Sequence, residues 1–263
     1  MSPRMRWRRT LKAAGLLLAL ACSYLAMLPA TWLDALLQNV SLGTLGMTAT
    51  RGSLWRGEGS LQAVQPSGEA VTLAPVNWDV ALGELLSLQL HLVMRSTQDG
   101  ATLLDASLKP GQIRIQSARL QLPATLLGVL SPTLRAADLS GQCLLQAKDV
   151  LLEKGRASGT AQVAWQGAGS SLSRIRPLGS YQLLLSGQGN GLDFRLMTLA
   201  GPLSLDGSGH WAPNQKSVYQ ITATPTEATR RDLVPLLRMM GRETTPGSYQ
   251  LTMDRNMGAV SSH

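Results

Sequence analysis

Aromatic residues, charges and cysteines are all scarce in this sequence, and each shortage excludes a class of protein. Aromatic residues make up 4% of the 263 residues, with a single Phe, so a core must be built mainly from Leu, Val, Ala and Met. Charged residues make up 15%, against a typical share of about 25%, while hydrophobic residues reach 44%. This composition excludes a disordered chain and differs from that of an ordinary cytosolic enzyme.

Side chains with catalytic or metal-binding spacing are also missing. The two cysteines, Cys22 and Cys143, build no disulfide framework, and we expect Cys143 to be a buried, inert thiol. His91, His210 and His263 have no spacing suited to a metal site, and no Gly-x-Ser-x-Gly elbow marks a nucleophilic serine. We therefore predict no enzyme, no catalytic residue, no metal and no cofactor.

The excess of positive charge lies at the start of the chain. The formal net charge is +8, but five of the 24 basic residues precede the first acidic residue, which leaves 19 against 16 acidic ones. So small an excess, spread over the rest of the chain, does not indicate a nucleic-acid partner. The five residues of this basic cluster are Arg4, Arg6, Arg8, Arg9 and Lys12.

A long apolar run follows the basic cluster. Ala13–Leu33 contains 21 residues without a charge, and about 20 apolar residues cross a bilayer as a helix. Because Lys and Arg are retained on the cytoplasmic side, the chain after this run should be exported. The sequence predicts a single-pass protein of the bacterial inner membrane, with a cytoplasmic segment 1–12, a transmembrane helix 13–33 and a periplasmic β-rich domain 34–263.

Three other interpretations of the run remain open. A cleavable signal peptide would be cut after Ala19-Leu20-Ala21, and a lipoprotein signal would lipidate Cys22. A buried core helix would leave the basic cluster unexplained.

Beyond the run, apolar residues alternate with polar ones, which indicates strands with one buried face. Leu86, Leu88, Leu90 and Leu92 show this alternation most clearly. Similar segments contain Ile113 and Ile115; Ala118, Leu120 and Leu122; Leu139, Cys143 and Leu145; Val163 and Trp165; and Leu203 and Leu205. Turn signals between them include Asp99-Gly100, Pro110-Gly111, Gly167–Gly169 and Asp206-Gly207. We therefore predict a mainly β fold, a curved, mostly antiparallel sheet that is either open or folded over itself.

Short helices are predicted at three places. Asp34–Asn39 continues the helical pattern of the apolar run, and Leu122–Leu130 has a helical composition. In Arg230–Met240 the apolar residues fall on one helical face, and Gly241 can end the helix.

One local motif, Arg51–Leu61, lies just beyond the predicted membrane span. Gly57 and Gly59 are two residues apart, so on a strand they remove side chains from one face and permit close approach of another backbone. The segment is either a tight hairpin whose Trp55 packs against the end of the sheet or a docking edge for a partner. The docking candidates are Leu54, Trp55, Gly57, Gly59 and Trp211.

These features, in this order, resemble protein N of the type II secretion system. The resemblance rests on the basic start and Leu28–Leu33, on the stretch Gly52–Gly59, and on Gly207–Trp211 followed by Leu236-Leu237, Gly241 and Gly247–Tyr249. It implies a non-catalytic accessory protein of the inner membrane that supports export of folded proteins across the outer membrane. The implied partners are other secretion components, the inner-membrane platform or the outer-membrane secretin, besides the lipid bilayer.

A second class of function fits the alternating strands. A curved sheet with an apolar trough would make a membrane-anchored, lipid-handling protein of the periplasm, so lipid is a conceivable ligand although no other small molecule is expected. The apolar residues either face a closed core or line an open trough, and the sequence does not distinguish the two.

Overall fold

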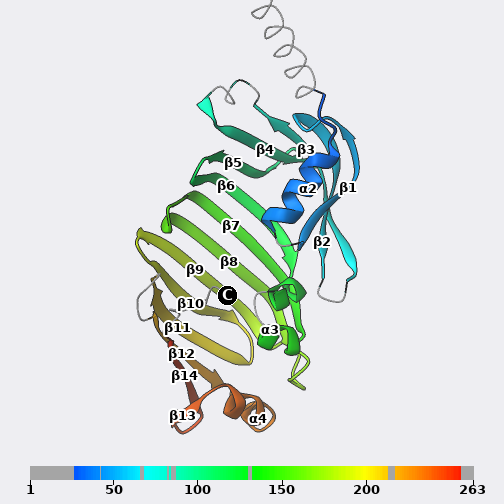
Figure 1. The fold of residues 1–263 in the computed structure, drawn as a ribbon. Helices are drawn as coiled ribbons and strands as arrows, with labels where there is room; N and C mark the ends of the chain where they lie inside the picture. The colour runs from blue at the N-terminus through cyan, green and yellow to red at the C-terminus, as the bar shows by residue number, and fades with distance from the viewer. Residues whose placement is uncertain are drawn as a thin grey trace, which may run out of the picture.

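Nearly all consecutive strands of the described residues pair with one another, and together the strands form one open antiparallel sheet. The computed structural model describes residues 27–255, apart from residue 42 and the segments 66–67, 82, 84–86, 130–131 and 213–216. The sheet has fourteen strands in chain order, except that β14 lies between β12 and β13. It extends from β1–β3 at one end to β12–β14 at the other (Figure 1).

The strands are β1 (Leu45–Gly52), β2 (Arg56–Val64), β3 (Ala70–Val80), β4 (Leu90–Ser96), β5 (Thr102–Lys109), β6 (Gln112–Pro123), β7 (Leu139–Glu153), β8 (Arg156–Ser170), β9 (Gly179–Gly189), β10 (Leu192–Ala200), β11 (Leu203–Trp211), β12 (Ser217–Pro225), β13 (Arg242–Thr245) and β14 (Ser248–Arg255). The helices are α2 (Thr31–Val40), the 3₁₀ helix η2 (Ala124–Val129), α3 (Pro132–Ala136) and α4 (Arg230–Met240).

The register of the strands separates an apolar face from a polar face. Leu145, Val163, Leu183 and Leu196 pair in turn across β7, β8, β9 and β10 and form an apolar row. The residue that follows Leu145 on β7, Gln146, pairs with Gln162, and this row points the other way because successive side chains alternate between faces.

The helices cover the apolar face at separate places, and each place is a hydrophobic cluster of its own. Leu33 of α2 packs with residues of β1–β4, including Trp78. Around η2 and α3, Ala124 packs with Cys143 of β7 and Leu139. At the far end, Leu233 and Leu237 of α4 are fully buried against β11, β12 and β14.

Trp78 of β3 ties the first hairpin to the sheet. Its side chain is only 2% exposed, and its indole N–H lies 3.2 Å from the carbonyl oxygens of Ser53 and Leu54 in the β1–β2 turn. The ring occupies the space beside Gly57, where an added Cβ would lie 2.5 Å from the ring and 2.3 Å from the carbonyl oxygen of Arg51. The absence of a side chain at Gly57 therefore lets Trp78 close the hairpin.

The outer edge of β1 is capped by side chains. The backbone N–H of Met47 donates to Asp34 Oδ1 of α2 at 2.7 Å, and that of Leu45 donates to Ser41 Oγ at 2.9 Å. These donors would otherwise be available to an added strand. The helix and the turn after it therefore close this edge at two positions.

The predicted fold class is confirmed in its main part, since the protein is mainly β, with one open antiparallel sheet and few short helices. The predicted helix Arg230–Met240 has the predicted bounds, and Asp34–Asn39 lies inside α2. Where a helix was predicted over Leu122–Leu130, the chain first completes β6 and then forms the 3₁₀ turn η2.

Several local predictions were wrong. The strand predicted from Leu86 begins only at Leu90, and Leu88 lies in a turn, with φ of 53° and 73% exposure. Asp206-Gly207 lies inside β11, so no turn forms there. Gly167 produces a register shift within β8 instead of ending the strand. At Asp206-Gly207 and at Gly167, pairing with neighbouring strands outweighed the local turn signal.

The predicted membrane span lies mostly outside the described residues. Within the described part of the chain, no helix combines the length and apolar character needed to cross a membrane. The last residues of the predicted span belong to the domain, because Ala30 and Leu33 are buried in the first cluster and Pro29 bridges to Ser53.

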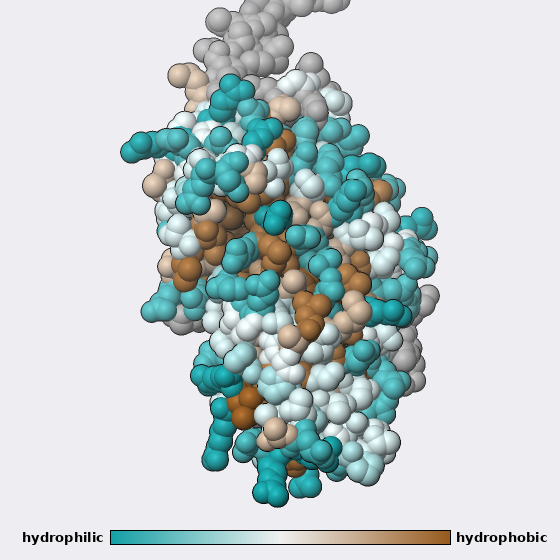
Figure 2. All heavy atoms as spheres, turned by 180° about the vertical axis from the view of Figure 1, so that it is seen from behind, coloured by the Kyte–Doolittle hydropathy of each residue, from teal (hydrophilic) through white to brown (hydrophobic). Residues whose placement is uncertain are grey.

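A sheet of one layer leaves apolar side chains at the surface. Figure 2 shows hydrophobic residues gathered across the upper and middle part of the face seen from behind, bordered by hydrophilic residues. Ile113 and Leu152, which pair between β6 and β7, are among the exposed large hydrophobic residues. The fold thus buries its apolar surface locally instead of in one thick core.

Replacing Trp78 by alanine is expected to lower the free energy of unfolding by about 3 to 5 kcal/mol, because it empties a fully buried site and removes the indole contact with the hairpin turn. The exposed Trp211 is the matched control, and Trp211→Ala should change stability by less than about 1 kcal/mol. Urea unfolding followed by circular dichroism compares the two. Equal losses in both variants would contradict the role given to Trp78.

Candidate functional site

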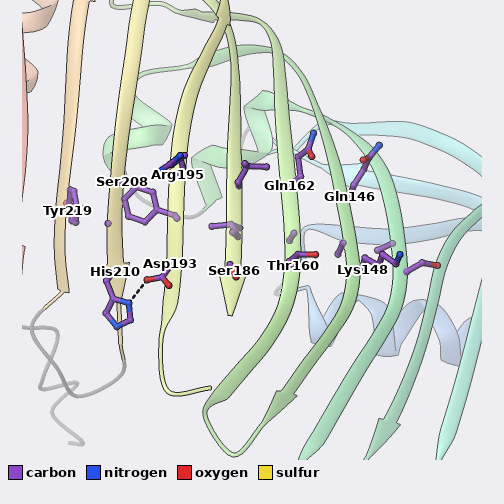
Figure 3. Close-up of a pocket in the computed structure, with 18 of the residues that line it drawn as sticks. Gln146, Lys148, Thr160, Gln162, Ser186, Asp193, Arg195, Ser208, His210 and Tyr219 are labelled. Carbon is purple, nitrogen blue, oxygen red and sulfur yellow. Dashed lines mark hydrogen bonds and ion pairs between the residues drawn. The ribbon is translucent and has the colours of Figure 1, made fainter. Parts of the chain in front are cut away.

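A hollow of about 1330 Å³ crosses the polar face of the sheet, from β6 to β12. Two rows of paired residues form its walls. One row contains Lys148, Thr160, Ser186, Asp193 and His210, which are partners on successive strands from β7 to β11. Figure 3 shows these polar side chains following one another along the neighbouring strands.

The second row lies two residues away from the first on each strand, and therefore on the same face. It contains Arg119, Gln146, Gln162, Leu184, Arg195 and Ser208 on β6 to β11. Between the two rows, Ala147, Ala161, Leu185 and Phe194 also line the hollow, but they belong to the row whose side chains point to the apolar face. The hollow is therefore lined by polar side chains together with apolar residues.

The hollow carries an excess of positive charge. Arg119, Lys148 and Arg195 are exposed, and within the described part of the chain none of them forms an ion pair. The carboxylate of Asp193 is occupied, because His210 Nδ1 lies 2.6 Å from Asp193 Oδ1. Four strand spacings of about 4.8 Å separate Arg119 from Arg195, so the cations cover roughly 19 Å.

This arrangement is suited to binding by hydrogen bonds and charge. Glutamine, serine and threonine side chains offer both donors and acceptors, and the three cations favour an acidic ligand. The second paired imidazole, His91, contacts Asp105 at 2.8 Å on β4 and β5, away from the hollow. The described residues contain no group of three or more His, Cys, Asp or Glu side chains placed to hold a metal ion.

The docking candidates from the first hairpin lie outside the hollow. Trp55 is 7% exposed and belongs to the first hydrophobic cluster, and Leu54 is half-buried against that cluster. Gly57 lies under Trp78, and an added Cβ at Gly59 would lie 3.1 Å from the carbonyl oxygen of Thr48 and 3.3 Å from Met47. The structure thus brings these four residues together in a packed hairpin.

Trp211 is separate from the hairpin. It is the last residue of β11, pairs with Leu192 and is exposed. Its neighbours Ser208, Gly209 and His210 line the hollow, whereas Trp211 does not.

The hollow itself was not predicted from the sequence. The sequence does contain a local pattern that could have indicated the hollow: Gln146 and Lys148 on β7, and Thr160 and Gln162 on β8, alternate with apolar residues. Each strand alone looks like an ordinary solvent-facing pattern. Only the register of the six strands β6 to β11 shows that these side chains form two continuous rows.

Cys143 is buried in the cluster under η2 and α3, as predicted. Burial among apolar side chains disfavours the thiolate and raises the pKa of Cys143 to about 11. Tyr181 of β9 is buried in the same row two strands away, with Trp165 of β8 between it and Cys143, and burial raises the pKa of Tyr181 to about 12. Its hydroxyl lies 3.1 Å and 3.0 Å from the carbonyl oxygens of Leu178 and Leu203, to which it can donate.

The fold and the hollow together define a class: a single-sheet β protein whose described helices cover the apolar face and leave the polar face uncovered. Comparison with protein families then identifies the particular family. The sequence model of type II secretion system protein N matches residues 43–252, which include nearly the whole sheet, and the chain belongs to this family. No curated protein and no solved structure gives a significant match.

The thiol of Cys143 is expected to resist alkylation in the folded protein. With the pKa raised from 9.0 to about 11, far less thiolate is present at pH 8 than for an ordinary cysteine. In a Cys22→Ala background, iodoacetamide at pH 8 should modify Cys143 slowly in buffer and rapidly in denaturant, as followed by mass spectrometry. Equally fast modification under both conditions would show that the thiol is accessible.

Proposed function

We propose that this protein is an accessory inner-membrane component of the type II secretion machinery, which supports export of folded proteins from the periplasm across the outer membrane. The observation that carries this proposal is the family match over residues 43–252. The family is a secretion accessory family, and no catalytic role is proposed for this chain.

The proposed location follows from the start of the sequence. The basic cluster before an uncharged apolar run supports one membrane anchor with its start in the cytoplasm and the sheet domain in the periplasm. The family match supports the same compartment, because the exported substrates of this machinery leave from the periplasm.

Within the machinery, the protein acts as a scaffold, and its hollow is the docking surface. Three exposed cations without an ion pair, beside hydrogen-bonding glutamine and serine side chains, suit an acidic, polar surface of another secretion component, in the inner-membrane platform or the outer-membrane secretin.

Deletion of the gene is the first test. Hydrolase activity that normally reaches the medium should remain in the periplasm of the deletion strain, and the wild-type gene on a plasmid should restore its release. Unchanged release, with altered envelope lipids or detergent sensitivity, would refute the secretion role and favour lipid handling.

The docking surface is tested by removing its charge in the complemented strain. The triple variant Arg119→Gln, Lys148→Gln, Arg195→Gln should reduce release severalfold at an unchanged protein level. The matched control removes three exposed cations outside the hollow, with Lys109→Gln, Arg114→Gln and Arg156→Gln, and should secrete normally. Normal secretion by both variants would show that the hollow is not the docking surface, while leaving the secretion role intact.

A further inference from the structure

Helix α2 has an apolar outer face that no described residue covers. Leu33 on its inner face is buried in the first cluster, and Leu37 packs against the same cluster. On the outer face, Trp32 is 56% exposed and Leu36 is 40% exposed. These two residues are four positions apart, so they lie next to each other on one side of the helix.

The outer face also lacks charge. Asp34 is the only charged residue of α2. Its carboxylate is turned to the sheet and the helix itself, where it accepts hydrogen bonds from the Met47 backbone N–H at 2.7 Å and from Gln38 Nε2 at 2.9 Å. A Trp and a Leu without a neighbouring charge form the kind of surface that settles at the boundary between lipid headgroups and acyl chains.

The chain is fixed to the domain immediately before this helix. The N–H of Leu54 donates to the carbonyl oxygen of Leu28 at 2.8 Å, Pro29 bridges to Ser53, and Ala30 is buried. Only the uncharged residues 13–27 are then left for a membrane span. As a helix, these residues would extend roughly 22 Å, which is less than the hydrocarbon thickness of about 30 Å.

A span shorter than the bilayer is accommodated by local thinning of the bilayer and by long basic side chains that reach to the interface. Either adjustment leaves the end of the span at the lipid interface, and the domain begins there without a free linker because Leu28 and Pro29 are already fixed to it. The first element that the domain presents there is α2, with Trp32 and Leu36 on its free side. The length of the span and the exposure of Trp32 and Leu36 therefore both indicate that the outer face of α2 contacts the membrane.

We infer that the outer face of α2, formed by Trp32 and Leu36, lies in the lipid interface of the periplasmic leaflet and sets the orientation of the sheet on the membrane. This inference rests on the membrane anchor proposed above. The occupant of the face is a phospholipid surface; a second copy of the chain or another protein on this face would appear as a different outcome of the test.

The test measures the depth of these positions with the full chain in nanodiscs of phosphatidylethanolamine and phosphatidylglycerol. A nitroxide label is attached to Trp32→Cys or Leu36→Cys in a Cys22→Ala background, and the parent without an introduced cysteine reports labelling of Cys143. The matched control is Leu199→Cys at the end of β10, where Leu199 is 56% exposed. Collision with oxygen and with a water-soluble nickel complex distinguishes lipid from water.

Labels at positions 32 and 36 should collide with oxygen more often than with nickel, whereas the label at 199 should show the reverse. Nickel access at 32 and 36 equal to that at 199 would overturn the contact while leaving the anchor intact. Low access to both reagents at 32 and 36 would overturn it in favour of a protein contact. Failure of the chain to enter nanodiscs would overturn the anchor, and the contact with it, but not the secretion role.

Discussion

The structure depends on one constraint: the sheet has a single layer, so its apolar face must be covered by something other than a second sheet. A sandwich would bury the rows around Leu145 and Val163 between two layers. Here three separate helical elements cover the face at its two ends and at one place between, each with its own cluster. Because the strands pair in chain order, each cluster is built largely from nearby sequence. Stability is therefore distributed along the sheet, and the loss of one buried residue such as Trp78 acts first on its own cluster.

The same constraint leaves the polar face open. All the described helices pack on the apolar side, so nothing that the structure describes fills the hollow between the Lys148 row and the Arg195 row. Its walls come from seven strands, and no single loop or helix carries the site. The charge pattern therefore depends on register: a shift of one residue in β8 would turn Gln162 and Thr160 to the apolar face. The proposed docking surface therefore forms only when the strands pair in this register.

Features with a strong local period could be predicted from the sequence. The alternation of apolar and polar residues predicted a mainly β fold, and the apolar spacing of Arg230–Met240 predicted the bounds of α4. Features set by partners across strands could not be predicted. Leu88 continues an alternating pattern but adopts a positive φ in a turn, and Trp78 gains its importance from carbonyl groups 24 and 25 residues away. The hairpin motif was noticed for its glycines, although the residue they accommodate, Trp78, lies on the next strand.

Helix α2 connects the fold to the proposed location. Through Asp34 and Leu33 it caps β1 and covers the first cluster, so the end of the sheet nearest the anchor is also its closed edge. If α2 rests on the membrane, successive strands lead away from it at about 4.8 Å per strand. Measured along the sheet from β1, the hollow then begins roughly 24 Å away at β6 and ends roughly 53 Å away at β12. The surface with exposed cations is thereby separated from the lipid headgroups and, in the proposed location, faces the periplasm.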